Sequence, residues 1–143
     1  RGLGDVYKRQ GLYKNASMGW DATCTILPKA EQEKLRTELC KQLEYYKEQK
    51  HAAETQLQKA CAIPKEQGAM AKLCADLSIR MHCCGSTSSG EIAKLMLKGT
   101  NTGVIQITQL LHQNPDISES VRHQSHAMLR HEEAYMDRLK TYL

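Results

Sequence analysis

The stretch Lys98–Leu111, KGTNTGVIQITQLL, decides the fold, because the chain contains a related stretch 84 residues earlier. The earlier stretch, Lys14–Leu27, reads KNASMGWDATCTIL. In each copy a glycine, Gly19 or Gly103, precedes a large apolar residue, and a pair of aliphatic residues begins seven positions after that glycine. Internal self-similarity of this kind predicts that one structural unit occurs twice in the chain.

The similarity continues into the following segment, where residues 121–143 match residues 35–57 at a spacing of 86. Apolar residues recur at helical spacing in both copies, and Pro28 and Pro115 fall between the helical patterns. Each copy is therefore predicted to form a helical hairpin. The predicted helices are residues 11–27 and 30–60 in the first hairpin and residues 88–112 and 117–143 in the second.

Residues 68–84, between the two hairpins, carry a shorter helical pattern. After it, Ser88 and Glu91 have the spacing of a capping box, which marks the start of the second hairpin. The sequence therefore predicts an all-α fold, a four-helix bundle of two helical hairpins joined by a crossover that contains a fifth, shorter helix.

Composition narrows the class of protein. The 143 residues carry a net charge of +4, and Lys and Arg are scattered among Glu and Asp, so no nucleic-acid partner is predicted. No apolar stretch approaches the roughly 20 residues that a membrane span needs. Six cysteines without a CxxC pair favour cytoplasmic thiols over disulfides or a zinc site. We therefore expect a cytoplasmic protein with no membrane span.

The first ten residues, RGLGDVYKRQ, do not fit the sequence that follows. They resemble translated sequencing-adapter read-through, so residues 1–10 are interpreted as a non-native segment and residues 11–143 as a single helical-bundle domain. A foreign segment makes few core contacts. Its deletion is then expected to leave the thermal midpoint nearly unchanged.

Helical periodicity also predicts the core. At about 100° per residue, Leu39, Leu43 and Tyr46 share one stripe of the second helix, whereas Glu48 and His51 point to solvent. The residues that we expect to be buried together are Trp20, Leu39, Tyr46, Val104, Leu111, Met128 and Leu139.

Three stretches, YKNASMGWDATCTILPK, IAKLMLKGTNTGVI and HEEAYMDRLKTYL, are similar to those of a known group of proteins. The chain resembles small bacterial ferritin-like helical-bundle proteins of unknown function, some of whose relatives are linked to spore coats. The resemblance covers residues 12–143 and consists of packing motifs. The resemblance implies a ferritin-like bundle, and from it we expect the protein to be associated with the spore.

A ferritin-like bundle raises the question of a di-iron site, which takes a Glu from each of two helices and a Glu-x-x-His pair from each of the other two. This chain has one such pair, Glu48 and His51, on the predicted solvent side. The matching positions in the second copy are Ala134 and Asp137. Most of the ligand set is missing, so no cofactor is expected, with iron as the alternative.

Glu132 is the carboxylate that falls inside an apolar stripe, close to Met128. A buried acid needs a partner or takes a raised pKa, and either can mark a functional site. We expect a structural role, in which Lys50 or a Tyr hydroxyl holds Glu132. Tyr46 is the residue that matches Glu132 in the repeat.

Other ligand-type residues give weaker indications. His123 and His126 fall on the outer half of the last helix, where metal binding would be adventitious. Cys83 and Cys84 could bind soft metals or oxidise, although free cysteines mostly behave as small apolar residues. No catalytic residue is predicted, and the weak metal candidates are Glu132, Glu48, His51, Cys83 and Cys84.

Two functions from different classes remain open. The first is a non-catalytic structural or interaction protein that associates with itself or with other proteins, with a spore layer as one expected location. The alternative is a divergent di-iron-type oxidoreductase or iron-handling protein. A metal assay on the purified protein separates the two.

Overall fold

The computed structural model of the chain describes residues 2–60, 62, 88–113 and 116–143. Most of these residues are helical, and none of them lies in a β-strand. A short 3₁₀ helix, η1 (Leu27–Lys29), joins the first two α-helices. The α-helices are α1 (Gly2–Ile26), α2 (Glu33–Lys59), α4 (Ser89–Gln113) and α5 (Glu119–Lys140).

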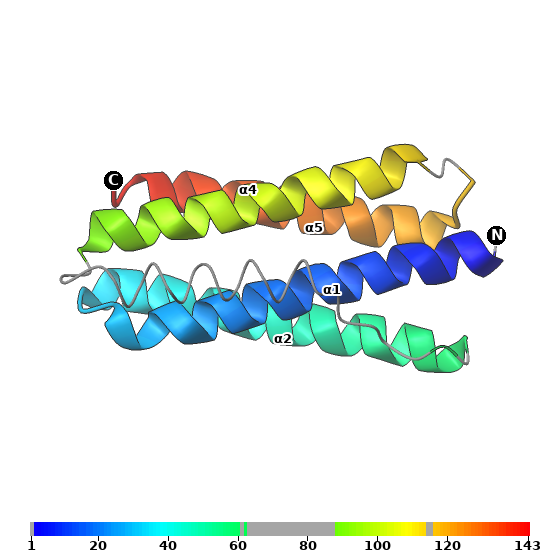
Figure 1. Cartoon of the computed structure of the whole chain (residues 1–143), viewed down its shortest axis with the longest axis horizontal. Helices are drawn as coiled ribbons and strands as arrows, with labels where there is room; N and C mark the ends of the chain where they lie inside the picture. The colour runs from blue at the N-terminus through cyan, green and yellow to red at the C-terminus, as the bar shows by residue number, and fades with distance from the viewer. Residues whose placement is uncertain (1, 61, 63–87, 114–115) are drawn as a thin grey trace.

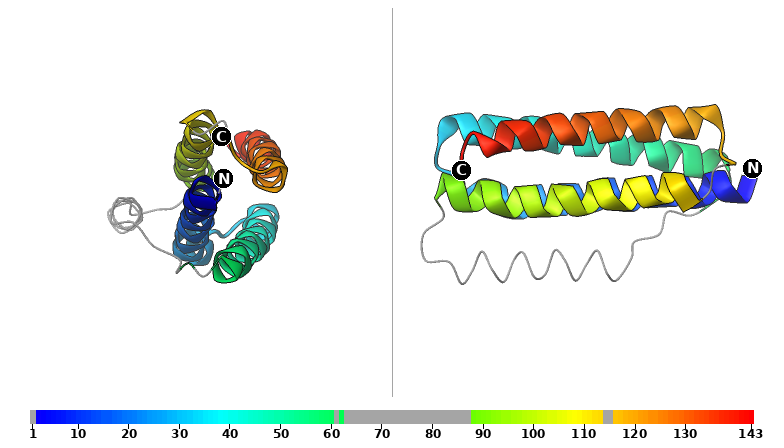
Figure 2. Two further views of the ribbon diagram at one scale, coloured as in Figure 1. Left: turned by 90° about the vertical axis from the view of Figure 1, so that its right-hand side faces the viewer. Right: turned by 90° about the horizontal axis from the view of Figure 1, so that it is seen from above.

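The four helices pack as two antiparallel hairpins, α1 with α2 and α4 with α5, which lie side by side (Figure 1). Seen end-on, α1 lies next to α4 and α2 lies next to α5 (Figure 2). The end of α2 and the start of α4 lie at opposite ends of the bundle, so a crossover connects the hairpins (Figure 1). The all-α bundle of two hairpins is confirmed. The fifth helix predicted for residues 68–84 lies outside the described residues.

Local sequence signals explain the helix ends. Pro28 stands in the first turn of η1, where its missing N–H leaves no helical hydrogen bond unmade. The Ser88 hydroxyl accepts a hydrogen bond from the Glu91 N–H at 3.2 Å, as the predicted cap requires. The Ser118 hydroxyl accepts one from the Val121 N–H at 3.3 Å and caps α5 in the same way. Side chains therefore satisfy N–H groups that the first turns of α4 and α5 cannot.

The first helix begins at Gly2, so residues 2–10 continue α1, and their exclusion from the fold needs correction. The segment contains no Pro, and extending an existing helix adds one hydrogen bond per residue ordered. Asp5 Oδ1 accepts a hydrogen bond from the Ser118 N–H at 2.9 Å. The origin of the segment as adapter sequence stays a prediction.

Lys8 shows that this extension fits the bundle poorly. Its side chain is 1% exposed, and its Nζ has no hydrogen-bond partner. Because a buried polar group without a partner destabilises the folded state, Lys8→Met is expected to raise the free energy of unfolding by about 1–3 kcal/mol in urea denaturation. Lys94→Met, at an exposed site of α4, is the control and should change little. A loss of stability in Lys8→Met would show that the ammonium group is stabilised in the folded chain.

The core consists of separate clusters along the bundle, because helices of 22 to 27 residues are about 33–40 Å long. The prediction that seven residues are buried together is therefore wrong. Leu39 and Leu139 share the largest cluster, Met128 lies in a second and Leu111 in another. The largest cluster consists of Ile26, Ala30, Leu35, Leu39, Ile92, Leu95, Met96, Tyr135 and Leu139.

Trp20, Val104 and Leu43 are half-buried, which corrects their prediction as core residues. In each case the preceding residue is turned further towards a neighbouring helix. Gln42 and Gly103 are buried, and Gly19 packs against the ring of Tyr46. The rest of the predicted stripes is confirmed, because Leu39 and Tyr46 of α2 and Met128 and Leu139 of α5 are buried.

The repeated glycine has the same use in both copies. A Cβ on Gly19 would lie 2.5 Å from Cε1 of the Tyr46 ring, and a Cβ on Gly103 would lie 2.8 Å from Asn15 Nδ2. Asn15 Nδ2 also donates a hydrogen bond to the Gly103 carbonyl at 3.1 Å. Each glycine therefore lets a side chain from a neighbouring helix pass directly against the backbone.

Candidate functional site

Glu132 is buried inside the bundle, as its place in the apolar stripe predicted. Its side chain is 1% exposed, and it is the only buried carboxylate among the residues that the structure describes. Spacings of three and four residues place it on the inward face of α5. The buried residues of that face are Val121, Ser125, Met128, Glu132, Tyr135 and Leu139.

Two side chains of α2 hold the Glu132 carboxyl group. The Tyr46 hydroxyl donates to Glu132 Oε2 at 3.0 Å, and Gln42 Nε2 donates to the same oxygen at 3.3 Å. The expected Tyr hydroxyl is confirmed. The alternative partner, Lys50, is wrong, because its Nζ lies 5.7 Å from the centroid of the Tyr13 ring.

The contact between Tyr46 and Glu132 joins equivalent positions of the repeat, which are 86 residues apart. Each hairpin contributes one member of the pair, α2 the phenol and α5 the carboxyl group. Two tyrosines would leave this interior without an acid, and two glutamates would place like charges together. The two positions that the predicted repeat pairs therefore carry complementary side chains where α2 and α5 meet.

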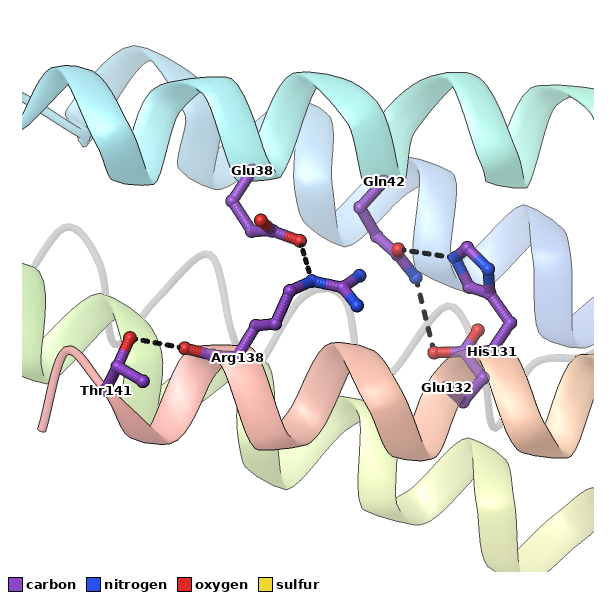
Figure 3. A network of polar contacts seen from close by, with 6 residues as sticks. All are labelled: Glu38, Gln42, His131, Glu132, Arg138 and Thr141. Atoms are coloured by element: carbon purple, nitrogen blue, oxygen red, sulfur yellow. Dashed lines mark hydrogen bonds and ion pairs between the residues drawn. The ribbon is translucent and has the colours of Figure 1, made fainter.

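Gln42 extends the network from Glu132 to the edge of the bundle (Figure 3). Its Oε1 lies 3.0 Å from Nε2 of His131. Since the Gln42 amide nitrogen donates to Glu132, its oxygen is the acceptor, and His131 Nε2 must carry the hydrogen. The half-buried His131 ring stacks on Tyr45 with centroids 3.4 Å apart. The chain of hydrogen bonds thus runs from a stacked imidazole to the buried acid.

Burial dominates the electrostatics of this network. It raises the pKa of Glu132 to about 7, with the Tyr46 hydrogen bond acting in the opposite direction. Burial also raises the pKa of Tyr46 and of Tyr135, and the negative charge of Glu132 raises both further. Burial lowers the pKa of His131; Arg138 adds to this shift and Glu38 opposes it. The network therefore favours neutral side chains.

Arg138 is the cation of α5 that Figure 3 draws, and its guanidinium group pairs with Glu38 and not with Glu132. Its Nε lies 2.6 Å from Oε1 of Glu38 on α2, and its side chain is 47% exposed. Its carbonyl accepts a hydrogen bond from the Thr141 hydroxyl. The charge of Arg138 therefore pairs with Glu38 and leaves Glu132 to neutral donors.

The other metal candidates do not gather around Glu132. Glu48 and His51 are exposed, as predicted, and so are the matching residues Ala134 and Asp137. His123 and His126 are exposed on α5, also as predicted. Cys83 and Cys84 lie outside the described residues.

In the part of the chain that the structure describes, the interior offers no ligand set for two iron ions. Among the described residues, no three His, Cys, Asp or Glu side chains come together. Apart from Glu132 and Lys8, the buried polar side chains of the described residues are neutral amides and hydroxyls. These groups are weak ligands for iron compared with carboxylates and imidazoles. The buried neutral polar residues are Asn15, Ser17, Thr23, Gln42, Thr100 and Ser125.

Gln42 and His131 belong to the network although the periodicity did not point to them. The apolar stripe favoured Leu43 over Gln42, because an amide has no apolar signature. The repeat contained a usable signal, since it matched Glu132 with Tyr46 and so indicated which faces of α2 and α5 meet. Residues one turn before Tyr46 and next to Glu132 then follow as neighbours.

Fold and site together define a helical bundle with one acid held in its interior by neutral side chains. Comparisons with protein families, with curated proteins and with solved structures found no match for this chain. None of the described helices is both long and apolar enough to cross a membrane.

Proposed function

We propose that this chain is a non-catalytic structural or interaction protein and that its polar interior serves the assembly of the bundle. The hydrogen bonding of Glu132 carries this proposal. The carboxyl group is bound by Tyr46 and Gln42, which come from the opposite hairpin, and no second acid accompanies it among the described residues. Such a network fixes how two hairpins pair, because a buried polar group is stable only when its partners are in place.

The surface of the described part supports the same proposal. A groove of about 250 Å³ lies between α1 and α4, and neither a carboxylate nor a histidine lines it. Histidines and carboxylates are the side chains that most often carry out acid–base catalysis in proteins. The residues that line the groove are Tyr7, Gln10, Gly11, Lys14, Gln106, Gln109, Leu110 and Gln113.

The finer assignments are parts of this proposal. A ferritin-like relationship fits two hairpins joined by a crossover, and self-association or binding of other proteins fits a bundle whose described interior contains a single acid. A cytoplasmic place and a link to spores rest on the sequence and on the resemblance alone. The alternative, iron-dependent oxidation, has only Glu132 as an inward acidic ligand in the described residues.

Iron binding tests the proposal. The purified protein, incubated with ferrous iron and desalted, is expected to retain less than a stoichiometric amount, as measured by elemental analysis. Glu132→Gln should keep the fold, because the amide has the shape of the acid, and should retain the same small amount. Iron that is stoichiometric in the parent and absent from Glu132→Gln would overturn the structural function. Glu48→Gln is the matched control at an exposed acid of α2.

A further inference from the structure

The two oxygens of the Glu132 carboxyl group have different surroundings. Oε2 accepts both hydrogen bonds, from Tyr46 and from Gln42, whereas Oε1 is buried with no protein partner. An ionised carboxylate spreads its charge over both oxygens, and each then needs donors. A neutral acid instead has one oxygen that accepts and one that carries its own hydrogen. The one-sided bonding of Glu132 is the pattern of a neutral acid with its proton on Oε1.

The groups on α2 and α5 do not compensate a charge at Glu132. The phenols of Tyr46 and Tyr135 are neutral, and the Tyr135 hydroxyl is buried with no partner of its own. His131 reaches Glu132 only through the Gln42 amide. Tyr45 stacks on His131, and Glu38 and Arg138 pair with each other. The half-buried Lys50 of α2 has its Nζ 5.7 Å from the centroid of the Tyr13 ring.

Helices α1 and α4 also provide no cation at this level of the bundle. Gly19 of α1 faces Tyr46. The buried Lys8 and the half-buried Arg9 lie ten or eleven residues before Gly19, about 15–16 Å away along the helix. Lys14 is half-buried and lines the groove between α1 and α4. The exposed charged residues of these two helices are Asp21, Glu91, Lys94 and Lys98.

From this geometry we propose that Glu132 is a neutral acid in the folded protein at pH 6 and that its ionisation at alkaline pH weakens the pairing of the two hairpins. A charge on the unpartnered Oε1 would be buried without a donor, and opening the contact between α2 and α5 relieves this charge by exposing it to water. The proposal deepens the structural function, on which it rests, by making hairpin pairing sensitive to pH. It also assigns Oε1 as the atom that holds the proton.

The direction of the effect follows from the proton balance. Glu132 has a pKa of about 7 in the folded chain, compared with 4.5 as the ordinary value. A raised pKa means that the folded chain binds the proton more tightly than the unfolded chain does. The stability that protonated Glu132 contributes is therefore fully present when the pH is below 4.5, and it is lost as the pH rises through about 7. From pH 6 to pH 8.5 the unfolding equilibrium constant should rise about tenfold from this group.

Glu132→Gln isolates this contribution, because the Gln amide group imitates the neutral acid and does not titrate. Urea denaturation is measured at pH 6 and at pH 8.5 for the parent, for Glu132→Gln and for Glu133→Gln, the last at the neighbouring exposed acid. Between the two pH values, the unfolding equilibrium constant of the parent and of Glu133→Gln should rise by a factor about ten times larger than that of Glu132→Gln. The change in the free energy of unfolding between the two pH values is subtracted, variant from parent, which removes the contributions of His131 and of the exposed groups.

Infrared spectroscopy gives a second reading that does not depend on unfolding. The parent at pH 6 should show the C=O band of a protonated carboxylic acid, which disappears at pH 8.5 and is absent from Glu132→Gln. Equal pH dependence in the parent and in Glu132→Gln, or no acid band at pH 6, would overturn the proposal. If one of these two results is found and the protein binds no iron, the structural function still stands. Stoichiometric iron on Glu132 would overturn both, because a metal ligand is ionised.

Discussion

Leu39→Ala is expected to lower the free energy of unfolding by about 2–5 kcal/mol, through lost transfer energy and a cavity. Leu39 is fully buried and belongs to the largest core cluster, to which all four α-helices contribute. Because these helices hold one another in position, the site cannot collapse to fill the space. Urea denaturation at fixed pH measures the loss. A loss below about half a kcal/mol would show that Leu39 is not packed as described.

Leu43→Ala is the matched control for this prediction. The sequence placed Leu39 and Leu43 in one stripe, whereas the structure leaves Leu43 half-buried and turns Gln42 inward. A half-buried leucine loses less apolar burial on truncation, so Leu43→Ala should cost clearly less than Leu39→Ala. Equal losses would support the original stripe. Leu111→Ala, in another cluster, is also expected to cost about 2–5 kcal/mol.

Gly19→Ala is expected to lower the free energy of unfolding by about 1–3 kcal/mol, although Ala favours helices over Gly by about 1 kcal/mol. The new Cβ would overlap the ring of Tyr46, which is buried and cannot move aside freely. Displacing the ring also breaks the hydrogen bond from its hydroxyl to Glu132. Thermal and urea unfolding would both record the loss, and a crystal structure would show the shifted phenol.

The control for Gly19→Ala lies at Gly99 of α4. A Cβ there would meet no atom within 4 Å, so the substitution adds helix propensity without overlap. Gly99→Ala is expected to raise the free energy of unfolding by up to about 1 kcal/mol. If both substitutions stabilise the protein, Tyr46 is not packed against the backbone of α1 as the structure places it.

Much of the site could be read from the sequence, because its central contact lies on the repeat. The burial of Glu132 followed from its place in an apolar stripe, and Tyr46 followed as its repeat partner. Lys50 was an equal alternative, because a helical wheel gives the direction of a side chain and not its reach. The contribution of Gln42 was not predicted, because the periodicity placed Leu43 on the inward face and an amide has no apolar signature.

The sequence alone determined the class of fold, the two hairpins and the solvent positions of Glu48 and His51. These features depend on periodicity, prolines and caps, which act within one helix or one turn. Only the tertiary structure decided that Gly19 and Gly103 admit neighbouring side chains, that the core divides into clusters, and that both donors to Glu132 reach one oxygen. Those features arise where two helices meet, and the rotation and separation of packed helices depend on side chains from both.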